Sequence, residues 1–194
     1  MQPQPNPRLS IDDYLAGEAE SRVRHEYVDG VAYAMGGARD AHVTIALNVA
    51  SFLREKLRGS GCRVYMADMK VHHVEQERFF YPDVFVTCDP ADHGRPLYKC
   101  APKVIIEVLS ASTAAYDRGQ KFAYYRAFAS LETYLLIESE GRAVDLYQRS
   151  ALAGDVTPGW MLRPYDGDDV ITLAPLHLQL PLATVYEDVT LPAR

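Results

Sequence analysis

The segment Lys103-Val-Ile-Ile-Glu-Val-Leu109 limits the possible folds of this chain more than any other part of the sequence. It is short, almost wholly apolar and rich in β-branched residues, which is the pattern of a β-strand buried on both faces. Such a strand lies inside a sheet that has helices on both sides. The sequence therefore predicts an α/β fold with a central β-sheet flanked by α-helices.

Glu107 places a charge inside this apolar strand. A buried carboxylate without a partner costs several kcal/mol, so we expect Glu107 to be protonated, paired with a base or bound to a cation. The alternative is that the strand lies at an edge of the sheet and Glu107 points into water. The sequence alone leaves both interpretations open.

Asp83, in the segment Tyr81-Pro82-Asp83, stands near the start of another predicted strand. Taken alone, it could equally be a turn or cap residue. On a neighbouring strand, however, its charge and that of Glu107 would disfavour joint ionisation unless a cation lay between them. Magnesium suits such a pair, because it takes one or two carboxylates together with water and phosphate oxygens.

Lys121 is the candidate for a third chemical group at this site. The sequence predicts a helix over residues 117–129, in which Arg118 and Tyr125 lie one turn before and one turn after Lys121 on the same face. A lysine close to a metal ion could position the attacking water and offset charge on the phosphoryl oxygens. The alternative is an ordinary lysine in solvent.

The rest of the sequence supplies further elements of the fold. A short helix capped by Ser10 precedes a hairpin over residues 22–35, which turns at Asp29-Gly30. An amphipathic helix is predicted over residues 40–58, with an apolar face formed by Val43, Ala46, Leu47, Ala50, Leu53 and Leu57. We then expect a three-stranded meander over residues 62–66, 69–74 and 79–87, followed by a long loop over 88–102. Two more strands are predicted over 134–137 and 143–148, and a closing hairpin over 171–180.

Composition sets the class of protein. With 194 residues, 48% of them hydrophobic, the chain can bury one core, so we predict a disordered tail over residues 1–9 and a single domain over 10–194. We expect a cytoplasmic protein that does not enter a membrane, because no signal-peptide pattern and no run of about 18 apolar residues occurs. Cys62, Cys88 and Cys100 form no close pair, which predicts reduced thiols and disfavours zinc.

The formal net charge of −6 argues against a general nucleic-acid coat protein, because sequence-independent phosphate binding needs an excess of Lys and Arg. It leaves an enzyme possible, since carboxylates that hold metal ions carry local negative charge until those ions bind. Overall charge therefore does not distinguish a nuclease from other enzymes.

Several of these segments together resemble a known family. Pro82-Asp83, the run from Pro102 to Thr113 that contains Glu107, and the run Tyr116-Asp-Arg-Gly-Gln-Lys121 are similar to the Uma-type family of putative restriction endonucleases, in the PD-(D/E)XK superfamily. The resemblance covers roughly residues 10–150 and includes Glu26 and His42. It implies a restriction-endonuclease-like fold, a mixed sheet flanked by helices with hairpins at the N-terminal and C-terminal ends, so residues 10–194 would be one nuclease-like domain.

The resemblance also implies roles for particular residues. Asp83 and Glu107 would be the metal-binding acids, with the main-chain carbonyl of Val108 as a further ligand, and Lys121 would be the catalytic lysine. The superfamily pattern has lysine two residues after the second acid, where this chain has Leu109, so that role would pass to the following helix.

Two further residues carry alternatives. Glu26 would be an additional catalytic acid near the metal, although a glutamate in a hairpin is more often solvated. His42, which the resemblance includes, stands at the start of a predicted helix. The alternative to a role in the site is that His42 only packs or hydrogen-bonds locally. Neither position is decided by the sequence.

The expected function is hydrolysis of phosphodiester bonds, most simply in DNA, by an endonuclease that uses Mg²⁺ with Mn²⁺ as a substitute. A homodimer is expected, because cutting both strands of a duplex calls for two sites related by symmetry. One alternative is a catalytically inactive module on the same fold that binds nucleic acid or a protein partner, through the loop at 88–102. Another is a hydrolase of some other phosphorylated substrate.

Overall fold

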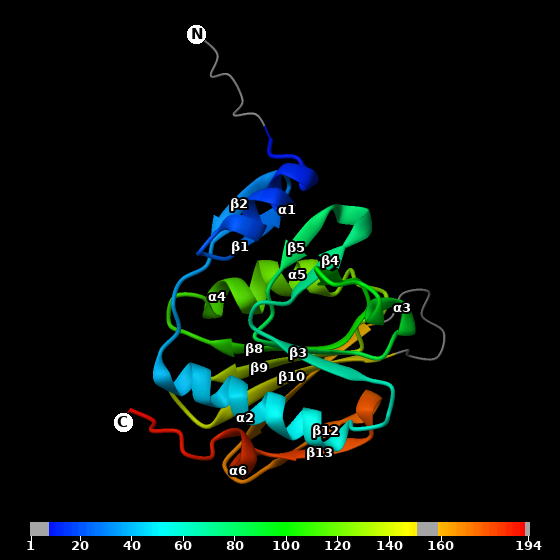
Figure 1. Cartoon of the computed structure of the whole chain (residues 1–194). Coiled ribbons are helices and arrows are strands. Elements are labelled where there is room, and N and C mark those ends of the chain that lie inside the picture. The colour runs from blue at the N-terminus through cyan, green and yellow to red at the C-terminus, as the bar shows by residue number, and fades with distance from the viewer. Residues whose placement is uncertain (1–7, 151–158, 193–194) are drawn as a thin grey trace.

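Two β-sheets of unequal size form the framework of the molecule, with helices between and beneath them (Figure 1). The computed structural model describes residues 8–150 and 159–192. The larger sheet has six strands in the order β11-β10-β9-β8-β6-β3; these are β3 (Arg63–Met66), β6 (Val84–Thr87), β8 (Pro102–Leu109), β9 (Thr133–Glu138), β10 (Ala143–Ser150) and β11 (Gly159–Asp166). Only β8 and β9 pair in parallel among these described strands, so the sheet is mixed, as predicted.

A smaller five-stranded sheet lies at the N-terminal end of the molecule. Its order is β2-β1-β5-β4-β7; these are β1 (His25–Val28), β2 (Val31–Ala34), β4 (Lys70–His73), β5 (Arg78–Phe80) and β7 (Tyr98–Lys99). A third, two-stranded sheet is the predicted closing hairpin, formed by β12 (Val170–Leu173) and β13 (Leu178–Pro181). Short 3-10 turns connect β4 to β5 and β12 to β13, at η1 (Val74–Gln76) and η3 (Ala174–Leu176).

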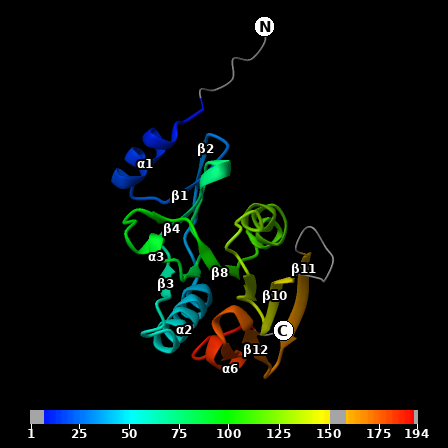
Figure 2. The ribbon, with the colours of Figure 1, turned by 90° about the vertical axis from the view of Figure 1, so that its right-hand side faces the viewer.

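Helices cover both faces of the larger sheet. One face packs on α2 (Asp40–Lys56) and on the C-terminal segment with α6 (Leu182–Val185). Over the other face run α4 (Ala114–Tyr116), the π-helical turn η2 (Asp117–Lys121) and α5 (Phe122–Tyr125), which connect β8 to β9. In the turned view, α1 (Ile11–Glu20) and the hairpin β1–β2 lie at the end of the molecule opposite α2 and α6 (Figure 2). The predicted α/β fold is therefore confirmed.

Strand β8 lies between β6 and β9 and is buried on both faces. Successive side chains of a strand point to opposite faces. Val104 and Ile106 accordingly pack in the core with α2, and Ile105 packs in the core with Tyr125. Glu107 lies on the same face as Ile105 and is only 3% exposed, so the alternative of an edge strand with Glu107 in water is wrong.

Local signals at the N-terminal end predicted the structure well. The Ser10 hydroxyl accepts a hydrogen bond from the Asp13 N–H and caps α1, and the hairpin turns at Asp29 and Gly30, with φ of 52° and 87°. Residues 1–7 of the predicted tail lie outside the described residues. Leu9, however, donates a backbone hydrogen bond to Gly30 at 2.9 Å, so residues 8 and 9 belong to the folded unit.

The predicted meander is wrong. Strand β3 pairs with β6 in the larger sheet, whereas β4 pairs with β5 in the smaller one. The segment at 79–87, predicted as one strand, is divided at Tyr81-Pro82-Asp83, where the chain crosses between the sheets. Proline cannot donate a ladder hydrogen bond, which explains why the strand ends there.

Two predicted segments differ in extent. The segment at 88–102 is not a simple loop, because it contains the helical turn α3 (Pro90–His93) and strand β7. The helix predicted over 117–129 begins earlier, at Ala114, and ends at Tyr125. On α2, two residues of the predicted apolar face, Val43 and Leu47, are about half exposed.

The prediction of three reduced thiols is wrong for two of them. Cys62 and Cys88 form a disulfide, and Cys100 is free. The register of β3 and β6 pairs Arg63 with Thr87, which brings the residues just outside those two positions face to face. The 26-residue separation of the two cysteines hides this pairing from the sequence.

Candidate active site

Asp83 and Glu107 meet where the chain enters the larger sheet. Asp83 directly precedes β6, whose register with β8 pairs Val84 with Ile106. The Asp83 N–H donates to Glu107 Oε2 at 3.4 Å, and the Val108 N–H donates to Asp83 Oδ2 at 2.7 Å. The pairing of strands therefore sets the two carboxylates side by side, as the sequence predicted.

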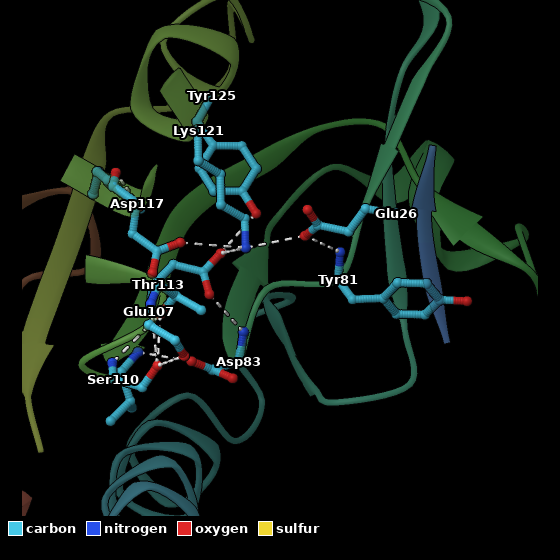
Figure 3. A network of polar contacts seen from close by, with 12 residues as sticks. Glu26, Tyr81, Asp83, Glu107, Ser110, Thr113, Asp117, Lys121 and Tyr125 are labelled. Atoms are coloured by element: carbon cyan, nitrogen blue, oxygen red, sulfur yellow. Dashed lines mark hydrogen bonds and ion pairs between the residues drawn. The ribbon is translucent and has the colours of Figure 1, made fainter. Parts of the chain in front are cut away.

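Lys121 reaches from the helical segment above the sheet into the centre of a group of acids (Figure 3). Its Nζ lies 2.9 Å from Glu107 Oε1, 3.0 Å from Glu26 Oε1 and 3.7 Å from Asp117 Oδ1. The Lys121 and Glu26 side chains are 7% and 9% exposed. The alternatives of a solvated Lys121 and a solvated Glu26 are therefore wrong.

The π-helical turn η2 determines which of its side chains point inward. It holds Asp117 and Lys121 toward the acids, while Arg118 pairs with Glu138 at 2.7 Å and Asp145 at 3.1 Å. A π-helical turn contains more residues than an α-helical one, so the α-helical spacing that placed Arg118 beside Lys121 does not hold. The prediction of a common face is wrong for Arg118.

Tyr125 lies one turn after Lys121, as predicted. Its hydroxyl donates a hydrogen bond of 2.7 Å to Glu107 Oε1, the same oxygen that contacts Lys121. On the opposite side, the Tyr81 N–H donates to Glu26 Oε1 at 3.4 Å. These contacts hold the two glutamates on either side of the lysine.

Two residues of the site were not assigned a role from the sequence. His42 Nε2 lies 3.0 Å from Asp83 Oδ1, although the two residues are 41 positions apart in the sequence. The hydrogen bond of His42 is therefore not a local one. Asp117, which is 4% exposed, lies beside Lys121. The only signal for Asp117 was its position four residues before Lys121, the spacing of side-chain neighbours on a helix.

The charges of this group do not balance. Glu26, Glu107 and Asp117 contact a single buried ammonium, that of Lys121, and Asp83 lies beside Glu107. Burial raises the pKa of Glu107 well above its usual value, and the neighbouring acids raise it further while Lys121 opposes them. Burial also raises the pKa of Asp117. For Lys121, burial acts to lower the pKa, but Glu107 and Glu26 more than reverse this, so it stays protonated.

The chemistry of these side chains fits a hard divalent cation. Within residues 8–150 and 159–192, no group of three or more His, Cys, Asp or Glu side chains is arranged to hold a metal ion. Mg²⁺ does not need such a group, because one or two carboxylates with water and carbonyl oxygens suffice. Asp83 and Glu107 supply adjacent carboxylate oxygens, and the surplus of negative charge would be relieved by a cation.

Comparisons with known proteins agree with one another. The family model described as "Uma2: Putative restriction endonuclease" matches residues 11–183. Two proteins of Synechocystis are similar along most of their length: the uncharacterized protein slr1290, 36% identical over 182 residues, and the uncharacterized protein sll1609, 30% identical over 164 residues. The matches cover 94% and 83% of this chain, and 93% and 89% of those proteins.

A solved structure shares the fold. A crystal structure from Anabaena variabilis, described as a putative nuclease belonging to DUF820, superposes with a TM-score of 0.75. The match covers 94% of this chain and 99% of that one, at 15% sequence identity. In the part of the chain that is described, no helix is long and apolar enough to cross a membrane.

Proposed function

Because the chain belongs to the Uma2 family, which is described as putative restriction endonuclease, we propose that it is a metal-dependent endonuclease that hydrolyses phosphodiester bonds in DNA. The observation that carries this proposal is the buried contact of Lys121 with Glu107 and Glu26, beside Asp83. Two adjacent acids and a lysine are the groups that phosphodiester hydrolysis needs, because charge develops on the phosphoryl oxygens.

The metal would be held by Asp83, Glu107 and the main-chain carbonyl of Val108. Mg²⁺, or Mn²⁺ in its place, would supply a water of lowered pKa and would neutralise charge on the phosphate. His42 Nε2 hydrogen-bonds with Asp83 Oδ1, and the Val108 N–H donates to Asp83 Oδ2. Together these two contacts fix the plane of the Asp83 carboxylate. The Tyr125 hydroxyl orients Glu107 in the same way.

Lys121 would act as a cation rather than as a base. Its pKa is raised by Glu107 and Glu26 against the effect of burial, so Nζ keeps its proton at neutral pH. A fixed ammonium at this point can donate to a phosphoryl oxygen and to the attacking water as charge develops. Glu26 and Asp117 would be positioning residues, which hold that ammonium in place.

The test is cleavage of supercoiled and linear DNA by the purified protein, with Mg²⁺ or Mn²⁺ and with chelator. We expect metal-dependent cleavage that falls by about a hundredfold or more in Lys121→Met, because a fixed charge that stabilises the transition state is lost. Lys70→Met is the matched control: Lys70 is also a buried lysine, at 9% exposure, and donates to the Tyr81 hydroxyl rather than to the acids. Equal activity in the two variants would contradict the proposal.

Metal binding is tested separately from activity. Mg²⁺ should raise the melting temperature of the wild-type protein and should do so much less in Asp83→Ala, because a ligand that binds only the folded state stabilises it. A wild-type melting temperature that does not respond to Mg²⁺ or Mn²⁺ would remove the metal from the proposal.

A homodimer is part of the proposal for duplex substrates. One active site cuts one strand, so a double-strand break by one assembly requires two copies related by symmetry. Analytical ultracentrifugation of the protein alone and with duplex DNA measures this. A monomer under both conditions would restrict the enzyme to cutting one strand at a time.

A further inference from the structure

An exposed tyrosine, Tyr33, lies beside Glu26 on the hairpin that carries this acid. Tyr33 is on β2, the edge strand of the smaller sheet, and is 54% exposed. The register pairs Tyr33 directly with Glu26. Residues directly opposite each other in an antiparallel pair project from the same face. The Tyr33 ring therefore leaves the hairpin on the face from which Glu26 contacts Lys121.

A second tyrosine lies next to another acid of this group. Tyr116 is the last residue of α4, directly before Asp117, and is 37% exposed. Asp117 Oδ1 lies 3.7 Å from Lys121 Nζ, so the neighbouring Tyr116 stands next to the buried acids. Burial raises the pKa of the Tyr116 hydroxyl, and the charge of Glu26 raises it further. Two partly exposed aromatic rings, from β2 and from α4, thus border the buried acids.

The surroundings favour bases rather than phosphates as the partners of these rings. Duplex DNA presents its phosphates outward, and proteins bind it mainly through Lys and Arg. The lysine of this site is 6% exposed and already surrounded by carboxylates, so it offers little exposed positive charge to the two phosphate backbones of a duplex. An unpaired strand can instead offer the faces of its bases, which stack on exposed aromatic side chains.

We propose that Tyr33 and Tyr116 are stacking residues for two bases of an unpaired DNA strand, and that they position this strand at Lys121. The substrate would then be single-stranded DNA or an unpaired segment of a duplex. This inference rests on the proposed nuclease function, because it assigns a substrate form to that same site. A single strand requires one active site, so the inference does not depend on the dimer.

Binding is measured without cleavage, by fluorescence anisotropy of a labelled mixed-sequence oligonucleotide in the presence of chelator. We expect the wild-type protein to bind the single strand more tightly than the matching duplex. Tyr33→Ala and Tyr116→Ala should each weaken single-strand binding by about tenfold and leave duplex binding nearly unchanged, since stacking is lost. Tyr33→Trp and Tyr116→Trp should restore the affinity. Met161→Ala, an equally exposed apolar residue on β11 at the far edge of the larger sheet, should have no effect.

An oligonucleotide with abasic sites sharpens the test, because it keeps the phosphates and removes the bases. Wild-type binding should weaken on this probe to the level of the double variant Tyr33→Ala/Tyr116→Ala on the intact strand, and the double variant should not weaken further. Alanine variants that bind the intact single strand as tightly as wild type would overturn the inference. The inference would also be overturned if Tyr33→Ala converted a dimer to a monomer without changing the affinity for the single strand. In that case β2 would be an interface between two copies of the chain.

The two proposals fail in different ways. Cleavage of duplex DNA with no effect of either tyrosine variant would leave the nuclease standing and refute the stacking residues. Tyrosine-dependent binding of single strands without cleavage of any DNA would support the stacking residues and refute the nuclease.

Discussion

Two buried carboxylates, Asp92 and Glu107, have pKa values that are shifted in opposite directions. Asp92 is fully buried on α3, and its oxygens accept hydrogen bonds from the Thr87 hydroxyl at 2.8 Å, Arg95 at 3.0 Å, and the Cys100 and Ala101 N–H groups at 2.8 and 3.0 Å. Burial acts to raise the pKa of Asp92, but these donors outweigh it and hold the pKa below its usual value.

Glu107 is buried to nearly the same extent but has a different environment. It accepts from the Tyr125 hydroxyl and, weakly, from the Asp83 N–H, and it shares Lys121 with Glu26 and Asp117. Its pKa is raised by burial and by the neighbouring acids. The two residues therefore differ in the number of donors and in the sign of the nearby charge, and not in burial.

This difference distinguishes Asp92, which stabilises the local structure, from Glu107, for which we propose a catalytic role. Asp92 ties together the segment at 88–102, and all of its bonds are made by the chain itself. Glu107 lies among Glu26, Asp83 and Asp117, and like charges close together disfavour joint ionisation. Under the proposed function, a cation would relieve this repulsion. Burial of an acid does not by itself indicate function, because Asp92 and Glu107 are both buried.

The largest expected effect is on catalysis. Glu107→Gln should lower DNA cleavage by about a hundredfold or more, because a metal-binding oxygen and its charge are lost. The free energy of unfolding should stay the same or rise, since the substitution removes surplus negative charge. Cleavage assays and urea unfolding of the same preparation measure both. A large loss of stability would mean that Glu107 is structural, like Asp92.

The matched change at the other carboxylate should act on stability. In Asp92→Asn, one acceptor oxygen becomes an NH₂ group, which must face N–H groups that now donate to Asp92. The substitution should therefore lower the free energy of unfolding by about 3 kcal/mol. Urea unfolding at neutral pH measures this. Specific activity per folded molecule should be unchanged, and a selective loss of activity would break the contrast between the two acids.

The sequence predicted those parts of the site that depend on a single strand or helix. The apolar strand around Glu107 and the helix position of Lys121 are local patterns, and the family resemblance joined them to Asp83 and Glu26. All four side chains do meet. Their roles in metal binding and catalysis stay predictions.

The remaining features depend on contacts between distant segments. His42 reaches Asp83 only because α2 begins beside the point where the chain crosses between sheets. The disulfide of Cys62 and Cys88 follows from a strand register, and the outward turn of Arg118 toward Glu138 follows from a π-helical turn. Local periodicity contains none of this, since it describes one element at a time.

A third buried ionisable group extends the comparison. His72 stacks on Phe79 with ring centroids 4.0 Å apart, and its Nε2 has no hydrogen-bond partner within the described residues. Burial, with smaller effects of His73 and Arg95, lowers the pKa of His72 to about 4. Unlike Asp92 and Glu107, this group avoids the cost of a buried charge by staying neutral.

The consequence is a loss of stability in acid. Below the ordinary histidine pKa of 6.5 the unfolded chain takes up a proton that folded His72 does not accept until about pH 4, so stability falls as pH drops through this range. The contribution at pH 5 should be about 2 kcal/mol relative to pH 7. His72→Phe keeps the stacked ring and should flatten the pH dependence of urea unfolding by that amount. If the pH dependence of the free energy of unfolding is the same in His72→Phe and wild type, the pKa of His72 is not lowered by burial.

The smallest expected effect concerns the hydrogen bond that Glu107 accepts from one neutral donor, the Tyr125 hydroxyl. Tyr125→Phe removes the hydroxyl that donates to Glu107 Oε1 at 2.7 Å and keeps the buried ring. Loss of one hydrogen bond to a carboxylate should lower the free energy of unfolding by about 1–2 kcal/mol. In Tyr125→Phe/Glu107→Gln the cost should shrink, because a neutral acceptor needs the donor less. Equal costs in the two backgrounds would mean that the Tyr125 hydroxyl stabilises the fold independently of the charge on Glu107.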